Sequence, residues 1–408
     1  MTAHVQVADL TMPHRLGSAT ITVVGPDGAA LANTPVEVRQ VRHDFLFGNI
    51  LFDLIPLMLG ESDDQVRDEA ELAEWRELFN FGTLPFYWRY FEPTEGAPQT
   101  AALLAAARRF ADMGIKLKGH PLTWHTLAPH WLMGRPLDQV EKVLRARITR
   151  DVSDFAGVID VWDAINEVVI MPEFKAEDNA ITPLCASLGR VDMAKLAFET
   201  ARQANPNATL LLNDFDLSVD YEHLIETLLE AGLKIDVLGL QTHMHQGYRG
   251  DDATTELLDR FARFGLPLHL TETSLVSGQL MPPDIIDLND YQVEEWPSTP
   301  EGEARQAEQI ATYYRTLMAH PAVQAVTYWG LTDRAAWLHA PIGFLRADGS
   351  RKPSYDALHD LVKGQWWLPP TTVLTDEAGR IDVTAFKGDY EYTVVPGAPE
   401  AVNYFHLG

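Results

Sequence analysis

Cysteine, long hydrophobic runs and clustered positive charge are all scarce in this sequence. Among 408 residues there is one cysteine, Cys185, which excludes an intramolecular disulfide and a cysteine-based zinc cluster. No stretch approaches the ~18 consecutive apolar residues of a membrane span. There is no long run of Lys or Arg, and 32 Lys+Arg against 58 Asp+Glu give a formal net charge of −26. We therefore expect binding neither to nucleic acid nor to a membrane.

A secretion signal is also not evident. The first 17 residues, MTAHVQVADLTMPHRLG, contain no basic segment followed by an apolar run. Together with the single cysteine, this start predicts a cytoplasmic protein in a reducing compartment. A secreted protein whose signal had been removed would show the same sequence.

Short apolar runs alternate with longer amphipathic stretches through the middle of the chain. Eight runs, rich in β-branched and aromatic residues, are predicted as strands buried on both faces: 43–50, 79–85, 115–120, 160–167, 209–215, 235–243, 267–272 and 325–330. Eight strand–helix repeats favour a closed (β/α)8 barrel, the TIM barrel, over an open doubly wound sheet. No GxGxxG or GxxxxGK[ST] motif follows a strand, so a nucleotide site is not expected.

The two ends of the chain do not follow this repeat. Alternating patterns predict strands at 19–25 and 35–41, joined by a Pro-Asp-Gly turn, and at 371–376, 380–386 and 390–395. A hairpin from either end alone would be marginal, so we expect both ends to combine into a small β-sheet or sandwich. The predicted division is residues 1–42 and 365–408 for this accessory module and 43–364 for the barrel. Two tryptophans in the linker GQWWLPP are expected to cover an interface, with sugar binding by the module as the alternative.

Candidate functional residues gather where the predicted barrel strands end, because active sites of such barrels lie at the carboxyl ends of the strands. These candidates are acids, amides, imidazoles and indoles: His120, Trp124, His125, Asn166, Glu167, Asn213, Asp214, Gln241, His243, Glu272, Trp329, Asp333 and Trp337. Two carboxylates, Glu167 and Glu272, fit glycosidic cleavage, in which one protonates the leaving oxygen and the other attacks the anomeric carbon or directs water to it.

Several segments also match a known family. GHPLTWHTLAPHWL, WDAINE, LLLNDFDL, IDVLGLQTHMH, LPLHLTET, YWGLTD and GFLRADGSRKPSYDAL resemble, in order, the signature blocks of glycoside hydrolase family 10, the retaining β-1,4-xylanases. The resemblance covers about residues 43–362. It implies Glu167 as the acid/base and Glu272 as the nucleophile, with their carboxyl groups ~5–5.5 Å apart.

The same resemblance implies roles for the substrate-binding candidates. Asn166 would hold the 2-hydroxyl of the sugar under attack, and Gln241 and His243 would orient Glu272. His120 and Trp124 would line the glycone side, Trp329 would form the floor, and Trp337 would close over the sugar. The expected partner is thus a carbohydrate or glycoside.

Other interpretations of single residues stay open at this point. His120, His125, His243 and His245 could form a metal cluster, although we expect neither a metal nor another cofactor. Asp214 and Asp333 could be loop or helix-cap residues, and Cys185 is expected to be a packed small residue. The sequence does not indicate an oligomeric state.

The chain departs from the family after its second predicted strand. A TPENxMKW-like block is expected there, but Leu84, Pro85, Phe86 and Tyr87 replace its polar residues. This change should weaken binding of an extended xylan glycone unless Tyr87, Trp88 or Arg89 compensates.

Long loops at 168–185 and 274–297 carry apolar residues that suit a hydrophobic aglycone, or that pack on each other. The predicted function is hydrolysis of β-1,4-xylan or xylo-oligosaccharides. One alternative is release of a sugar or disaccharide from small glycosides with an apolar aglycone, and another is a non-catalytic carbohydrate-binding protein.

Overall fold

A computed structural model of the chain describes residues 3–7, 9–334, 336–395 and 402–408. Its central feature is a closed barrel of eight strands, in the order β10-β11-β4-β5-β6-β7-β8-β9, with every neighbouring pair parallel. The strands are β4 (Leu46–Ile50), β5 (Phe81–Pro85), β6 (Lys116–His120), β7 (Val161–Asn166), β8 (Thr209–Asp214), β9 (Val237–Met244), β10 (Leu268–Leu275) and β11 (Val323–Tyr328). The predicted (β/α)8 barrel and its eight strands are confirmed.

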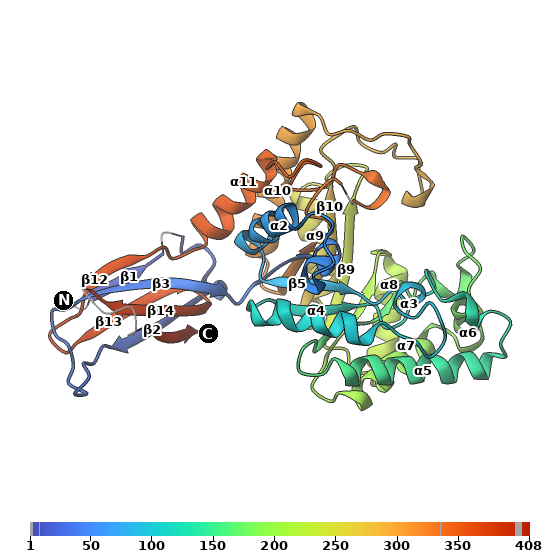
Figure 1. Ribbon diagram of the computed structural model, residues 1–408, viewed down its shortest axis with the longest axis horizontal. Helices are drawn as coiled ribbons and strands as arrows, with labels where there is room; N and C mark the ends of the chain where they lie inside the picture. Colours follow the sequence, from blue (N-terminus) through green and yellow to red (C-terminus); the bar gives the residue numbers. More distant parts are fainter. Residues whose placement is uncertain (1–2, 8, 335, 396–401) are drawn as a thin grey trace.

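Helices surround this barrel (Figure 1). They are α1 (Ile55–Leu59), α2 (Gln65–Leu78), α3 (Trp88–Phe91), α4 (Thr100–Asp112), α5 (Leu137–Asp154), α6 (Ile181–Leu188), α7 (Arg190–Ala204), α8 (Val219–Glu230), α9 (Asp251–Ala262), α10 (Pro300–Ala319) and α11 (Pro353–His359). Side-chain oxygens of Asp64, Ser218 and Thr299 accept backbone N–H groups at the starts of α2, α8 and α10 and so satisfy donors that a helix leaves free. In the described ranges no helix is both long and apolar enough to cross a bilayer.

The barrel strands have mostly apolar sequences because both of their faces are covered by other parts of the protein. β7 and β10 are buried at every residue, and side chains from six strands form a separate apolar cluster inside the barrel: Leu46, Phe81, Val161, Leu211, Val237 and Ala325. These residues stand in the first half of their strands. The other end of the barrel interior is therefore left for polar side chains.

The two ends of the chain build two further sheets, as expected. One has the order β1-β13-β2 and the other β12-β3-β14-β15. Their strands are β1 (Ala3–Gln6), β2 (Leu16–Thr22), β3 (Pro35–His43), β12 (Thr371–Leu374), β13 (Arg380–Phe386), β14 (Gly388–Val394) and β15 (Asn403–Leu407). Figure 1 shows them together as a module beside the barrel that contains both chain ends.

Pairing within this module differs from local hairpins. β2 pairs with β13, while β3 pairs with β12 and β14, so the neighbouring strands β2 and β3 enter different sheets, as do β12 and β13. The Pro-Asp-Gly turn after β2 is closed instead by a bridge between Val24 and Ala30. Burial explains this arrangement, because Val36, Val38, Ile381 and Val383 project from the two sheets into one hydrophobic cluster. A lone hairpin would leave these side chains in water.

The linker tryptophans lie between the module and the barrel. Trp366 is buried and stacks on Phe47 of the first barrel strand, with ring centroids 6.1 Å apart. Trp367 lies 5.1 Å from the ring of His43, at the end of β3. Because β3 runs almost directly into β4, the module adjoins the amino-terminal ends of the barrel strands, opposite their carboxyl ends.

Candidate active site

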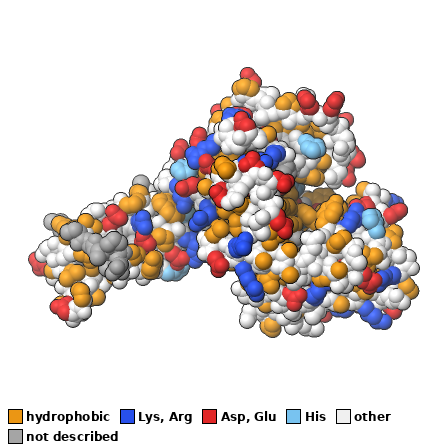
Figure 2. All heavy atoms as spheres, in the orientation of Figure 1, with side chains coloured by type: hydrophobic (Ala, Val, Ile, Leu, Met, Phe, Trp, Pro, Cys, Tyr) orange, Lys and Arg blue, Asp and Glu red, His pale blue; other side chains and the backbone are white. Residues whose placement is uncertain are grey.

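Two glutamates face a shared polar network at the carboxyl ends of the barrel strands. Glu167 follows β7 directly, and Glu272 lies in β10. The side chain of Glu272 is 7% exposed and that of Glu167 is 13% exposed, so both carboxyl groups are largely shielded from water. Figure 2 shows the surface hollowed on this side of the barrel, between the two lobes that rise on either side of the mouth.

Glu167 is held by three N–H donors. Trp124 Nε1 donates to Oε2 at 2.7 Å, and Asn166 Nδ2 and Gln241 Nε2 donate to Oε1 at 3.0 and 3.3 Å. Its backbone has φ 57°, in the left-handed region, and its N–H donates to the carbonyl of Asn213. A non-glycine residue held in this region is costly and is typical of functional positions.

Glu272 is contacted from the neighbouring strand β9 and from two more distant strands, β8 and β6. Nε2 of His243 donates to Oε2 at 3.2 Å, and Asn213 Nδ2 donates to Oε1 at 3.1 Å. Nε2 of His120 lies 3.9 Å from Oε1. Asn166 joins the two halves of the network, because its Oδ1 accepts from both Asn213 Nδ2 and Gln241 Nε2.

The environment shifts the pKa values of the two carboxyl groups in opposite directions. Burial, followed by the charge of Glu272, raises the pKa of Glu167 to about 8. Burial would also raise the pKa of Glu272, but His120, His243 and Lys118 together hold it below the ordinary value. At neutral pH the pair therefore holds one proton, on Glu167, next to an ionised Glu272. Such a pair can serve as a proton donor beside a nucleophile.

A buried ion pair, Lys118 with Asp163, lies next to His120. The prediction from residues at strand ends did not include it. Nδ1 of His120 is 2.7 Å from Asp163 Oδ2, and Nζ of Lys118 is 2.8 Å from the same oxygen, with all three side chains buried. Burial opposes ionisation of Asp163, but Lys118 and His120 outweigh it and lower the pKa of Asp163. The available signal was a pair of charged residues, Lys118 and Asp163, inside runs otherwise predicted as buried strands.

Aromatic rings wall the network. Trp329 packs edge-on against His120 and lies 6.3 Å from His243, and Trp337 lies 4.9 Å from His243. Tyr87 lies 5.7 Å from both His120 and Trp124. Burial and the charges of Glu272, Glu167 and Asp163 raise the pKa of the Tyr87 hydroxyl. Acids, amides and flat apolar faces together suit a sugar ring.

This constellation agrees with the comparison to known proteins. The family model described as glycosyl hydrolase family 10 matches residues 87–361. The chain belongs to glycoside hydrolase family 10. The resemblance noted in the sequence is thus confirmed, and family 10 comprises retaining hydrolases of O-glycosyl bonds.

Relatives of this family 10 chain are distant but cover most of it. It is 27% identical over 305 residues to an endo-1,4-beta-xylanase/feruloyl esterase of Xylanibacter ruminicola. This match covers 67% of this chain and 40% of that protein. It is 28% identical over 286 residues to endo-1,4-beta-xylanase B of Thermotoga neapolitana, covering 63% of this chain and 73% of that protein. The chain therefore spans less than half the length of some curated relatives that it matches.

Solved structures share the barrel fold. Xylanase 10B from Thermotoga petrophila, crystallised in complex with xylobiose, has a TM-score of 0.64 at 22% identity and covers 78% of this chain and 94% of that chain. The family 10 structure from Paenibacillus barcinonensis has a TM-score of 0.64 at 24% identity. The match covers 78% of this chain and 95% of that chain.

Two of the residues predicted for the family 10 site, Trp88 and Arg89, have their polar contacts with residues other than Glu167 and Glu272. Nε1 of Trp88 donates to Glu92, and the ring carries the guanidinium of Arg147 at 4.6 Å. Arg89 donates to the carbonyl of Ala128 and pairs with Glu177 in the loop after β7. Of the three residues suggested to compensate for the altered segment, Tyr87 is the one that lies beside His120 and Trp124.

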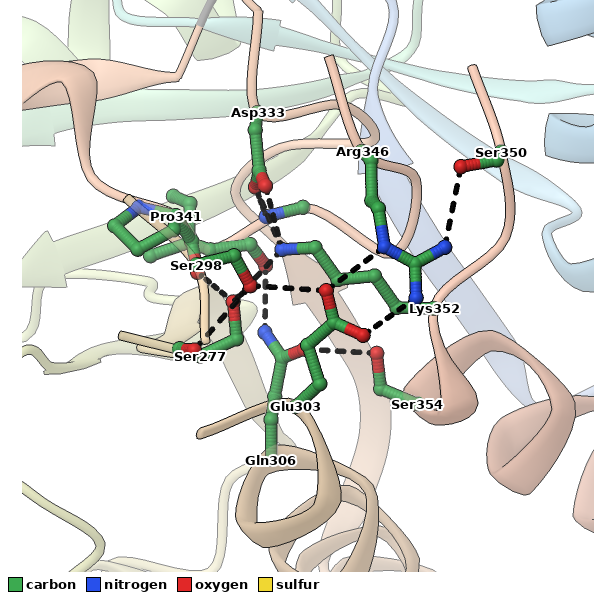
Figure 3. A network of polar contacts seen from close by, with 12 residues as sticks. Ser277, Ser298, Glu303, Gln306, Asp333, Pro341, Arg346, Ser350, Lys352 and Ser354 are labelled. Carbon is green, nitrogen blue, oxygen red and sulfur yellow. Dashed lines mark hydrogen bonds and ion pairs between the residues drawn. The ribbon is translucent and has the colours of Figure 1, made fainter. Parts of the chain in front are cut away.

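Asp333 belongs to a neighbouring polar network (Figure 3). Its carboxylate binds the buried ammonium of Lys352 at 2.7 Å and accepts the N–H of Gly343. Lys352 also donates to Ser277, and Arg346 faces Glu303 in the same network. Asp333 thus joins segments of the loop after β11 and is linked through Lys352 to Ser277 after β10.

Asp214 also has a local role. Its carboxylate accepts the backbone N–H groups of Val169 and Asp216, which ties together the loops after β7 and β8. Burial raises its pKa to about 7.

His125 and Cys185 are both buried. His125 lies 3.8 Å from Glu167, packs on Phe174, and has its pKa lowered to about 3 by burial. Cys185 is a buried thiol whose pKa is raised to about 12 by burial. Over the described ranges, no three His, Cys, Asp or Glu side chains are arranged to hold a metal ion.

Proposed function

We propose that this protein hydrolyses β-1,4-xylan or xylo-oligosaccharides by double displacement, with Glu167 as acid/base and Glu272 as nucleophile. The observation that carries the proposal is the opposite pKa displacement of two shielded glutamates joined by one hydrogen-bond network. The names of the two xylanase relatives support the choice of substrate.

In the first step, a carboxylate oxygen of Glu272 forms a bond to the anomeric carbon while the bond to the leaving oxygen breaks. Glu167 transfers its proton to that oxygen, so the departing group leaves as an alcohol. The donors on Glu272 from His243 and Asn213 aim the carboxylate and keep it ionised before the attack.

In the second step, Glu167 acts as a base. Esterification removes the negative charge of Glu272, which is one cause of the raised pKa of Glu167. The pKa of Glu167 therefore falls once the intermediate forms, and its carboxylate can take a proton from water. The water oxygen attacks the anomeric carbon, and Glu272 leaves as a carboxylate.

The surrounding residues suit this chemistry on an uncharged sugar. Trp329, Trp337 and Tyr87 present flat rings, and Asn166 and Gln241 present amides at the same mouth. A neutral glycoside is not repelled by the net charge of −26.

Glu167→Ala and Glu272→Ala, each measured against an aryl β-xyloside and against xylo-oligosaccharides, test the assignment. We expect Glu272→Ala to lose at least about 10³-fold in kcat/KM on both substrates, because the displacement has no nucleophile. Glu167→Ala should lose as much on xylo-oligosaccharides but retain rapid release of an activated phenol, which departs without a proton.

Glu222→Gln on α8, where Glu222 pairs with Arg260 and Arg263, is the matched control and should leave the rates unchanged. Equal rates for Glu272→Ala and wild type would contradict the proposal and favour a carbohydrate-binding protein. The initial anomer of the product, followed by NMR, should retain its configuration; inversion would contradict double displacement.

The substrate itself is tested with a panel of xylan, xylo-oligosaccharides and small aryl and natural glycosides. Cleavage of xylan into a ladder of products supports the proposed substrate. Release of one sugar or disaccharide only from small glycosides would contradict it.

A further inference from the structure

A cavity lies where the terminal module meets the barrel. It has a volume of about 230 Å³ and is lined from β3, from the end of α2 and the residues after it, from the loop before β6 and from the segment after α11. Phe79 and Asn80 directly precede β5, and Ile115 directly precedes β6, so the cavity lies at the amino-terminal ends of the barrel strands. It is therefore separate from Glu167 and Glu272, which lie at the opposite ends.

Positive charge is concentrated at this junction. The charged residues that line the cavity are Arg42, Arg76 and Lys363, and no Asp or Glu is found among the described lining residues. A second cavity, of about 330 Å³, shares His43 with the first and is lined by further cations and one acid: Arg15, Lys116, Lys387 and Asp44. The whole chain has 58 acids against 32 Lys+Arg, so the balance of charge is reversed here. Figure 2 shows Lys and Arg side chains, in blue, over this junction.

Two carboxylates near these cavities already have partners. Asp389 pairs with Arg42 at 2.6 Å and with His406 at 2.9 Å. Asp44 lies 3.3 Å from the other nitrogen of the same imidazole ring. These acids therefore form one group around Arg42 and His406, and they do not pair with the other two cations of the first cavity.

Those two cations, Arg76 and Lys363, have no adjacent counter-ion. Among the described residues, no carboxylate forms an ion pair or a hydrogen bond with either side chain, and Nζ of Lys363 lies 4.0 Å from the centroid of the Trp367 ring. Burial lowers the pKa of Lys363, and Glu77 opposes this only through a longer-range charge. An ammonium group that is shielded from water in this way is stabilised by an anion that enters the cavity.

The uncharged part of the lining indicates what kind of anion fits. Several of the remaining lining side chains are apolar, among them Val41, Met113, Ile115 and Trp367. The amide of Asn80 has no free donor, because its Nδ2 donates to the carbonyls of His43 and Phe45. The His43 ring is uncharged near neutral pH, since burial lowers its pKa to about 4. Positive charge beside apolar walls suits an organic anion better than an inorganic one.

We propose that this cavity binds a small phosphate ester. A phosphate monoester carries a charge of about −1.5 to −2 at neutral pH, which matches the two cations that lack a counter-ion, whereas a carboxylate would match one of them. The guanidinium of Arg76 can donate two parallel N–H groups to phosphate oxygens. A volume of about 230 Å³ leaves room for a short carbon skeleton beside the phosphate. The proposal does not depend on the hydrolysis proposed at Glu167 and Glu272.

Thermal unfolding of the whole 408-residue chain at constant ionic strength tests this site. The ligand would contact both the module and the barrel, so glycerol 3-phosphate should raise the melting temperature by about 2–4 °C in a saturable manner. Inorganic phosphate should have a smaller effect, and glycerol and glycerate should have almost none. No shift with glycerol 3-phosphate would overturn the proposal. An equal shift with glycerate, or with inorganic phosphate, would also overturn the assignment to a phosphate ester.

Variants of the two unpaired cations test which residues bind the phosphate. In isothermal titration calorimetry, Arg76→Gln and Lys363→Gln should each weaken binding of glycerol 3-phosphate at least about tenfold, because each removes a charge-assisted contact. Lys363→Arg keeps the charge and should bind within about threefold of wild type.

Arg108→Gln is the matched control, because Arg108 is an exposed arginine of α4 that has no carboxylate partner among the described residues. It should bind glycerol 3-phosphate like wild type. The side chain of Arg76 is exposed as well, so Arg76→Gln remains decisive even if Lys363→Gln does not fold. Wild-type affinity in Arg76→Gln would show that the anion is not held in this cavity, and the proposal would be wrong.

Discussion

The single residue Glu167 links the proposed chemistry to stability. Its pKa rises from an ordinary 4.5 to about 8 in the folded protein, so folding favours its protonated form. Below about pH 4.5 this group has no effect on stability, and its destabilising effect grows up to about pH 8, where the folded protein must also release the proton.

Glu167→Gln removes the ionisation and should therefore stabilise the protein increasingly with pH. We expect no gain in the free energy of unfolding near pH 4 and a gain of about 3–5 kcal/mol above pH 8. Urea denaturation across this range measures the difference, with Glu77→Gln at an exposed position of α2 as control. A gain that is the same at every pH would contradict the assigned environment.

At the residue scale, the sequence was sufficient to locate residues that stand at strand ends. Glu167, Glu272, Asn166 and His243 end predicted strands, and barrel geometry brings such ends together. Lys118 and Asp163 could not be found in this way, because they lie within their strands and meet through the β6–β7 neighbourhood. The hydrogen bonds of Asn213 likewise depend on strand register, which no local pattern encodes.

At the scale of one element, the segment joining β5 to α3 contains both residues that pack in the core and a residue that lies at the candidate site. Leu84 and Phe86 are fully buried, and Phe86 packs against Phe91, Phe155 and Trp162 in the layer outside the barrel. Tyr87, the next residue, packs beside His120 and Trp124. The apolar residues of this segment thus complete the core, and one aromatic ring faces the mouth.

Substitutions at these adjacent positions should have opposite consequences. Phe86→Ala should cost about 3–5 kcal/mol of unfolding free energy, because it empties a fully buried site, while KM of the remaining folded protein stays near wild type. Tyr87→Ala should raise KM for xylo-oligosaccharides several-fold with a smaller loss of stability. Thermal unfolding and steady-state kinetics on both variants check this; a raised KM in Phe86→Ala with none in Tyr87→Ala would reverse the interpretation.

The elements themselves were predicted to different extents. Barrel strands buried on both faces leave continuous apolar runs, so all eight were identifiable, although β9 and β10 extend past their predicted ends. The terminal strands alternate clearly, but strands of one end pair with strands of the other that lie more than 300 residues away, as in the pairing of β2 with β13. Local turn chemistry therefore suggested hairpins where burial selects long-range pairs.

At the scale of the whole molecule, we propose that residues 43–364 form the catalytic unit, and that 1–42 with 365–408 form a module that stabilises it without contributing to catalysis. The module joins the barrel just before β4 and just after α11, and helices of such a barrel return the chain to the amino-terminal ends of the strands. The glutamates lie at the opposite ends.

Val383→Asp tests this division, because Val383 is buried in β13, the central strand of one module sheet. An unpaired buried carboxylate should unfold the module, lowering the melting temperature and exposing residues 1–42 to proteolysis. The kcat/KM of the soluble folded fraction should stay within about twofold of wild type. Val383→Ile, which keeps the site apolar, should change neither property strongly. Loss of activity in proportion to loss of the module would show that the barrel needs the terminal sheets to hold Glu167 and Glu272 in place, and the proposed division would then be wrong.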